Sequence, residues 1–144
     1  MESAISILTR HGIELEDLVE TGFRLYVSTA GNDDIAAARN RLRDLLSRYL
    51  EDSNVWLMIA AASYLDELIS SGGDEASSLS DDPASLVADE LIGMSIAEYI
   101  AGKKGLFNYV RYDREKPGVI GDLPPFMDDA VGALVAASMT RVFE

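Results

Sequence analysis

Residues 35–49 read IAAARNRLRDLLSRY, and this stretch indicates the fold class of the chain. Its apolar side chains recur mostly at intervals of three and four residues, at Ile35, Ala38, Leu42, Leu45, Leu46 and Tyr49. Such spacing is typical of one stripe of an amphipathic helix. Asn32 and Asp33 stand just before the stretch and offer side-chain oxygens of the kind that cap helix starts. The stretch therefore predicts a helix that packs on a core through one face.

Helical spacing continues on both sides of this stretch. We expect a preceding helix over Leu15–Thr29 that ends near Gly31, and a following helix over Val55–Ser70 that Ser53 caps. No convincing run of alternating apolar and polar residues occurs, so strands are not expected. The sequence predicts an all-α fold in which residues 1–144 form a single multi-helix bundle of about five to seven helices.

The second half of the chain contains two further predicted helices. Ser71–Pro83 is polar and rich in glycine and serine, which indicates a flexible connector. Asp82-Pro83 is typical of a helix start, and that helix should reach about Ala101 and stop at Gly102. The last helix should run from Pro124-Pro125 to Val142.

Two features of this half stand out. The last helix carries no charge between Asp129 and Arg141, so its middle should be buried. Between the two helices, Gly102–Leu123 is expected to be a long connection with four glycines and a proline. Long connections inside compact domains are uncommon and are often functional.

Composition excludes several classes of protein. The chain has 25 acidic and 12 basic residues, and a formal net charge of −13 disfavours binding to nucleic acid or to anionic membrane. The longest apolar run, Val55–Ala62, has eight residues, whereas a membrane span needs about 20. Met1–Arg10 lacks the pattern of a secretory signal, and the absence of cysteine favours a cytoplasmic protein without disulfides or thiolate metal sites. Cation binding remains open.

Two acidic doublets differ from the others. Most doublets in this chain fall at predicted helix starts or in turns, where acids are common. Asp89-Glu90 and Asp128-Asp129 instead align, at helical spacing, with small and apolar residues, namely Leu86, Gly93, Met94, Ile96, Ala97, Ile100, Ala101, Val131, Gly132, Ala133, Val135 and Ala136. A buried carboxylate shifts its pKa, pairs with a base or binds a metal. These four acids are therefore candidate metal ligands, and Asp66, which aligns with Ile59 and Ile69, is a weaker one.

Basic residues gather between the two doublets. Five of the 12 bases lie within 14 residues, at Lys103, Lys104, Arg111, Arg114 and Lys116. Hard carboxylate ligands suit Mg²⁺, which shares its coordination sphere with phosphate oxygens, and Arg and Lys hold the remaining oxygens. The pattern predicts a phosphate-ester site. The alternative interpretation is a solvated turn whose bases pair with nearby acids.

Three motifs in the second half resemble those of the phosphatidylglycerophosphatase A family. They are D-E-x-x-G at Asp89, Glu90 and Gly93, R-x-D-x-x-K-P at Arg111, Asp113, Lys116 and Pro117, and D-D-x-x-G at Asp128, Asp129 and Gly132. The resemblance covers roughly residues 83–142, and GVIGDLPPFMDD at 118–129 is similar to the soluble branch of the family.

This resemblance implies an all-helical phosphomonoesterase that depends on Mg²⁺, with Mn²⁺ as an alternative ion. Its acidic motifs assign Asp89, Glu90, Asp128 and Asp129 as metal ligands. Arg111 and Lys116 would bind and neutralise phosphate, with Lys103 and Lys104 as further candidate contacts. Asp113 would be a further ligand or a base that positions water.

The substrate implied by the resemblance is a small phosphomonoester. The chain lacks the hydrophobic spans and the G-T-x-G-S stretch of the membrane-bound members. It is more similar to a soluble group that removes the 5′-phosphate from α-ribazole phosphate during cobamide (vitamin B12) assembly. A lipid phosphate, as in phosphatidylglycerophosphate, is the alternative substrate.

Two rival functions are also considered. One is an all-α nucleotide pyrophosphohydrolase, although the paired E-x-x-E and E-x-x-D patterns of that class are not found. The other is a non-enzymatic oligomerisation module in which the inner acids pair with Arg111, Arg114 and Lys116. A homo-oligomer is a candidate assembly, because the segment around Trp56 suits either a core or an interface.

Overall fold

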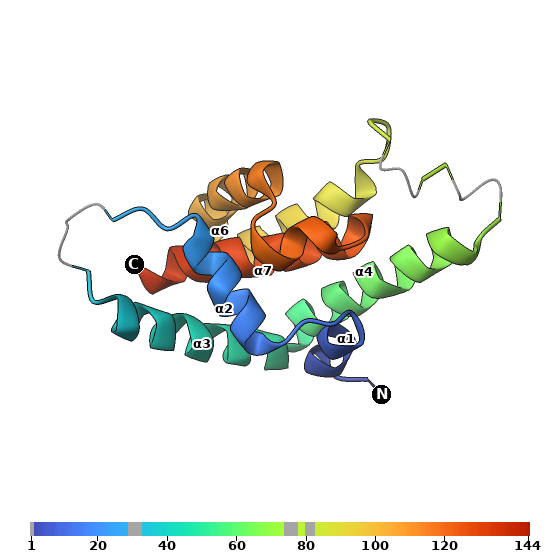
Figure 1. Ribbon diagram of the computed structural model, residues 1–144. Helices are drawn as coiled ribbons and strands as arrows, with labels where there is room; N and C mark the ends of the chain where they lie inside the picture. The colour runs from blue at the N-terminus through green and yellow to red at the C-terminus, as the bar shows by residue number, and fades with distance from the viewer. Residues whose placement is uncertain (1, 29–32, 74–77, 80–82) are drawn as a thin grey trace.

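The computed structural model describes residues 2–28, 33–73, 78–79 and 83–144 (Figure 1). Six α-helices and one 3₁₀ helix, η1, lie in these ranges: α1 (Ala4–Arg10), α2 (Leu15–Arg24), α3 (Ile35–Glu51), α4 (Ser53–Ser71), α6 (Ala88–Glu115), η1 (Gly118–Asp122) and α7 (Pro125–Val142). Within the same ranges there is no strand. The predicted all-α class is confirmed.

Helix α7 lies at the centre of the molecule. Every residue from Phe126 to Met139 is buried, because small and apolar side chains surround the whole helix. Figure 1 shows α7 crossing the middle of the fold, with α6 on one side and α3 and α4 on the other, and α7 contacts all three. The prediction that the middle of this helix is buried is confirmed.

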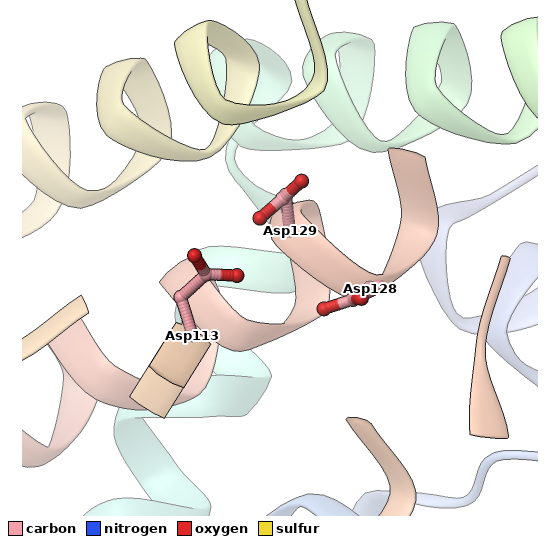
Figure 2. Close-up of side chains that lie close together, drawn as sticks. All are labelled: Asp113, Asp128 and Asp129. Atoms are coloured by element: carbon pink, nitrogen blue, oxygen red, sulfur yellow. The ribbon is translucent and has the colours of Figure 1, made fainter. Parts of the chain in front are cut away.

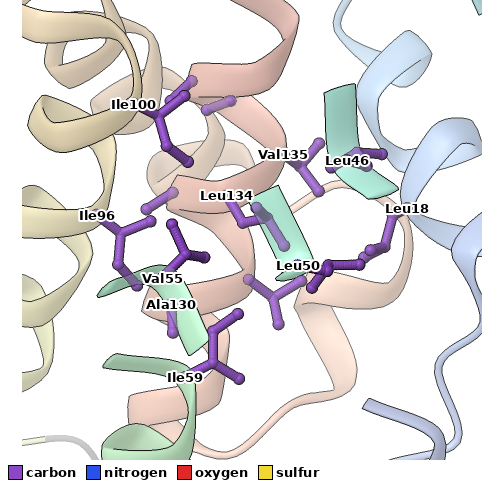
Figure 3. Packing of buried hydrophobic residues seen from close by; sticks show 14 of the residues in the cluster. Leu18, Leu46, Leu50, Val55, Ile59, Ile96, Ile100, Ala130, Leu134 and Val135 are labelled. Atoms are coloured by element: carbon purple, nitrogen blue, oxygen red, sulfur yellow. The ribbon is translucent and has the colours of Figure 1, made fainter. Parts of the chain in front are cut away.

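One hydrophobic cluster joins side chains from all the described helices. Figure 3 shows its centre, where Leu134 of α7 lies among residues of the neighbouring helices, including Leu18, Leu46, Val55, Ile59 and Ile96. The stripe predicted for α3 is buried at Ala38, Leu42, Leu45 and Leu46, whereas Ile35 is exposed. None of the helices in the described ranges is long and apolar enough to cross a membrane.

Several helix ends differ from the sequence prediction. Asp34 caps α3 by accepting a hydrogen bond from Ala37 N, while the Asp33 carboxylate accepts one from the Tyr26 hydroxyl. Asp52, rather than Ser53, caps α4, because its carboxylate accepts from the backbone N–H groups of the first turn. Helix α2 ends at Arg24, earlier than predicted. The predicted cap at Asn32 and helix end at Gly31 lie outside the described residues.

The largest correction concerns α6. It begins at Ala88, not near Pro83, and continues to Glu115 through a break at Ala101–Gly102, where Gly102 has φ 62° and ψ −150°. The predicted break at Gly102 is confirmed, but the prediction that Gly102–Leu123 is a long connection is wrong. Residues after the break are helical because Gly105, Tyr109 and Tyr112 are buried at intervals of four and three, and α6 packs closely on α7. The basic residues thus lie mainly on a helix.

The predicted connector falls partly outside the structure. Ser71 still belongs to α4, and residues 74–77 and 80–82, including Asp82 of the predicted helix start, lie outside the described ranges.

Candidate active site

Three carboxylates meet where the end of α6 faces the start of α7. Asp113 comes from the last turn of α6, and Asp128 and Asp129 from the first turns of α7. Each offers an oxygen, and these oxygens all lie within 4.8 Å of one another. Figure 2 shows the three side chains around a common space. The turn through η1 reverses the chain and so brings the two helix ends together.

Lys116 ties two of these acids together. Its Nζ donates to both oxygens of Asp128, at 2.6 and 2.8 Å, and to Asp113 Oδ1 at 3.1 Å. The residue ends α6 in the left-handed conformation, with φ 46°, which turns the chain toward η1. Burial alone would lower the pKa of Lys116, but the bonds to Asp128 and Asp113 outweigh it and raise that pKa. The lysine therefore remains a cation beside the acids.

Asp129 has no such counter-charge. It is 3% exposed, and within the described ranges no lysine, arginine or histidine nitrogen lies within 4 Å of its carboxylate. Its Oδ1 accepts a hydrogen bond of 2.7 Å from the Tyr109 hydroxyl. Burial, and then the neighbouring carboxyls of Asp113 and Asp89, raise the pKa of Asp129 to about 9. At neutral pH this group needs either a proton or a cation.

Comparison with known proteins places the chain in a family. Residues 24–144 match the sequence model described as phosphatidylglycerophosphatase A. The chain belongs to the phosphatidylglycerophosphatase A family. An uncharacterised protein of Methanocaldococcus jannaschii is 35% identical over 130 residues, which cover 88% of this chain and 100% of that protein. Membership indicates a phosphatase-like role.

Solved structures share the fold of this family member. The low temperature requirement C protein of Listeria monocytogenes superimposes with a TM-score of 0.83 at 25% identity, over 97% of this chain and 92% of that one. A protein of unknown function from Bacillus stearothermophilus has a TM-score of 0.80 at 24% identity, over 97% and 95% of the two chains. The second likeness concerns the fold alone.

The first acidic motif of the phosphatidylglycerophosphatase A family opens α6. Asp89 is 2% exposed, and its Oδ1 is buried without a hydrogen-bond partner within the described structure. Its carboxyl adjoins Asp129. Glu90 is exposed, so its predicted place on a buried face is wrong, because the start of α6 buries only one side. The role of both acids as metal ligands stays a prediction.

Not all of the predicted phosphate-binding bases lie near Asp113, Asp128 and Asp129. Arg111 is about 200° around the helix from Asp113, since the two are two positions apart. Its guanidinium donates to Leu25 O at the end of α2 and lies over the Tyr112 ring, 5.6 Å from the centroid. It lines a separate cavity of about 300 Å³ with Tyr26, Asn108, Met139 and Phe143, among others. Of the predicted bases, Lys116 alone forms ion pairs with these acids within the described ranges.

The other bases are exposed on α6. Lys103 and Lys104 follow the break in the helix, and Lys104 lies about 14 Å along the axis from Asp113 at 1.5 Å per residue. Arg114 pairs with Glu115 at 3.9 Å. A role of Lys103 and Lys104 in phosphate binding stays a prediction.

Asp66 supports the site from α4. It is 6% exposed, and its two oxygens accept hydrogen bonds from Phe126 N at 2.9 Å and Met127 N at 2.8 Å. It thus satisfies the first N–H groups of α7, just ahead of Asp128. Burial raises the pKa of Asp66, and the two N–H donors oppose that shift. The inward orientation expected from the sequence is confirmed, and the contact made is structural.

Sequence reasoning missed Tyr109. It is 2% exposed and lies one helical turn before Asp113. The only signal was its spacing of four residues from that aspartate. Its partner, Asp129, is distant in the sequence, so the contact depends on how α6 packs on α7.

Proposed function

We propose that this protein is a divalent-metal-dependent phosphomonoesterase that uses Mg²⁺, or Mn²⁺ in its place. The observation that carries the proposal is the meeting of Asp113, Asp128 and Asp129 beside Lys116 in a chain of a phosphatase family. Burial and the neighbouring carboxyls raise the pKa of Asp129, so the charged form is disfavoured there unless a cation is bound.

The residues present fit such an ion. The donors are all carboxylate oxygens, the ligands that Mg²⁺ prefers. Asp113, Asp128 and Asp129 would hold it, and Asp89 offers a buried oxygen that has no hydrogen-bond partner in the described part of the chain. Glu90 would have to approach from the solvent side. When bound, Mg²⁺ supplies positive charge that polarises a phosphoryl group and favours attack by water.

The protein's own groups would carry the remaining steps. Lys116 has a side chain that is 38% exposed, so its Nζ can contact both the acids and a phosphate oxygen, where it would offset developing negative charge. Asp113 is more exposed than Asp128, at 28% against 10% of the side chain. An oxygen of Asp113 that does not hold the ion would orient the attacking water and accept its proton, while the ester P–O bond breaks and the leaving alkoxide takes a proton from solvent. Arg111, in its separate cavity, would contribute only if the substrate extends to that side.

The substrate we propose is α-ribazole 5′-phosphate. Support comes from the similarity of residues 118–129 to the soluble branch of the family, which acts on that compound. The lipid phosphate named by the family description is the alternative substrate.

The test is release of inorganic phosphate by the full chain after removal of metals with EDTA. We expect turnover of α-ribazole 5′-phosphate on addition of Mg²⁺, and less turnover of nucleoside monophosphates or phosphatidylglycerophosphate. Asp129→Asn should reduce the rate by about 100-fold or more, since losing metal-derived stabilisation costs several kcal/mol. Glu98→Gln, an exposed acid on α6, is the matched control and should keep the wild-type rate. A folded Asp129→Asn variant with full activity would contradict the proposal.

A second candidate follows from the Lys116 ion pairs. Bridges from Lys116 to Asp113 and Asp128 are what a non-enzymatic helical module would contain. Asp129 argues against that function, because it is buried and no base lies within 4 Å of it in the described ranges. No hydrolysis of any phosphomonoester, together with stability that is insensitive to Mg²⁺, would favour the module. Release of pyrophosphate from nucleotides would instead favour a pyrophosphohydrolase.

A further inference from the structure

A buried hydroxyl holds one oxygen of Asp129. Tyr109 is 2% exposed, and its hydroxyl donates to Asp129 Oδ1 at 2.7 Å. The tyrosine lies on α6 one turn before Asp113, and the aspartate lies on α7. The bond therefore joins the two helices that supply the acidic site. Burial, followed by the bond to Asp129, raises the pKa of Tyr109 well above its usual range, so the hydroxyl remains a donor.

Gly93 provides the space for this contact. A Cβ atom at Gly93 would lie 2.4 Å from the Tyr109 hydroxyl oxygen and 2.6 Å from its Cζ. It would also lie 3.0 Å from the backbone oxygen of Asp129. Real Cβ atoms essentially never come within 3.0 Å of another heavy atom, so the two contacts with Tyr109 require glycine at this position. Gly93, the glycine of D-E-x-x-G, thus leaves room for the Tyr109 hydroxyl to bond Asp129, the second aspartate of D-D-x-x-G.

We propose that Tyr109 is a positioning residue for the acidic site, and that Gly93 gives its hydroxyl access to Asp129. Holding Oδ1 fixes the orientation of the carboxylate, so that its second oxygen would be held toward Asp113 and Asp128, where a cation would bind. Hydrogen bonds to ligating carboxylates act in this way around metal ions, and they affect affinity although they do not touch the metal. The inference rests on the proposed function, because it assigns Tyr109 to the cation site proposed there.

The chain offers a matched control in Tyr112. This residue lies three positions further along α6, is 1% exposed, and its hydroxyl donates to Gly22 O on the side of α2. Tyr109→Phe and Tyr112→Phe each remove one buried hydroxyl and keep the ring. A purely structural role for Tyr109 would make the two variants behave alike.

The experiment measures Mn²⁺ binding to the EDTA-treated full chain by calorimetry, and unfolding by urea on the same samples. We expect Tyr109→Phe to weaken Mn²⁺ binding about 10- to 100-fold. Tyr112→Phe should bind Mn²⁺ as the wild type does, while both variants lose a similar amount of stability. Wild-type Mn²⁺ affinity in Tyr109→Phe would overturn the inference and leave the proposed function standing. Failure of the wild type to bind Mn²⁺ and to release phosphate would overturn both.

Gly93→Ala gives an independent check. Its methyl group should displace the Tyr109 ring and weaken Mn²⁺ binding. In the double variant with Tyr109→Phe, the two losses should be far from additive, because both act through the same bond. Fully additive losses would overturn the assigned role of Gly93. If Gly93→Ala does not fold, Tyr109→Phe alone decides the proposal.

Discussion

Asp128 and Asp129 are adjacent in the chain but have different electrostatic surroundings. Asp128 is bonded through both oxygens to Lys116, whereas Asp129 faces Tyr109 and two other acids. Consecutive residues on a helix point about 100° apart, so one doublet can supply both an anchored acid and an acid that needs a cation. The same step of about 100° separates buried Asp89 from exposed Glu90.

At this scale, Asp66→Ala should destabilise the fold by about 1–3 kcal/mol. The substitution leaves two N–H groups at the buried start of α7 without their acceptor, and unpaired buried donors carry that cost. The free energy of unfolding in urea measures the effect. Ser70→Ala, an exposed position on the same helix, is the control. Equal stability of Asp66→Ala and Ser70→Ala would show that Asp66 does not cap α7.

Helix α6 is two helical segments joined at a glycine. Gly102 has φ 62° and ψ −150°, a conformation that residues other than glycine rarely adopt. The break lets the first segment carry Asp89 and the second carry Tyr109 and Asp113 toward the same end of α7. Gly132 on α7 is a different case, because it has helical geometry and space beside it, where a Cβ atom would lie 3.7 Å from Ile120.

Substituting alanine for these two glycines should change the free energy of unfolding in opposite directions. Gly102→Ala should destabilise the protein by about 1–3 kcal/mol through backbone strain. A clash does not contribute, because a Cβ atom there would meet no other atom within 4 Å. Gly132→Ala should stabilise it by up to about 1 kcal/mol, because alanine favours the helix and fits the space. Thermal and urea unfolding of both variants measure this. A neutral Gly102→Ala variant would disprove the strained break.

At the scale of the whole molecule, the acidic residues behind the net charge of −13 differ in how far basic residues neutralise them. Exposed acids pair with arginines at several places, as in Glu16–Arg43 and Glu2–Arg10, where solvent screening keeps each pair weak. The cluster at the start of α7 is different, because its acids are buried and crowded. Binding of one cation there would stabilise the entire fold by mass action.

The stability of the metal-free protein should depend on pH through Asp129. Its pKa of about 9 in the fold lies above the unfolded value of 3.8, so the folded state holds the proton more tightly. The resulting stabilisation is complete below pH 3.8 and is lost as pH rises through 9. In EDTA at pH 8, Asp129→Asn should therefore melt at a higher temperature than the wild type.

Excess Mg²⁺ should reverse this order, because only the wild type retains all the ligands. Melting temperatures with EDTA and with Mg²⁺ measure both effects. A wild type that melts at the same temperature in the two buffers, and above Asp129→Asn in each, would contradict the prediction.

The sequence by itself determined the helical class, the buried last helix, the break at Gly102 and the inward acids Asp89, Asp128 and Asp129. These follow from local rules, since helical spacing, glycine conformation and the absence of charge act over a few residues. The same rules failed for residues 103–115, where glycines and basic residues suggested a loop. Burial against α7, which no local pattern contains, decided that this segment is a helix.

Only the tertiary structure decided which groups meet. It brought Asp113 and Lys116 to the two aspartates of α7 and directed Arg111 to a different cavity. It also paired Tyr109 with Asp129 in the space left by Gly93. Positions that are distant in the chain come together through the packing of α6 on α7, and the spacing of residues within one helix carries no information about that contact.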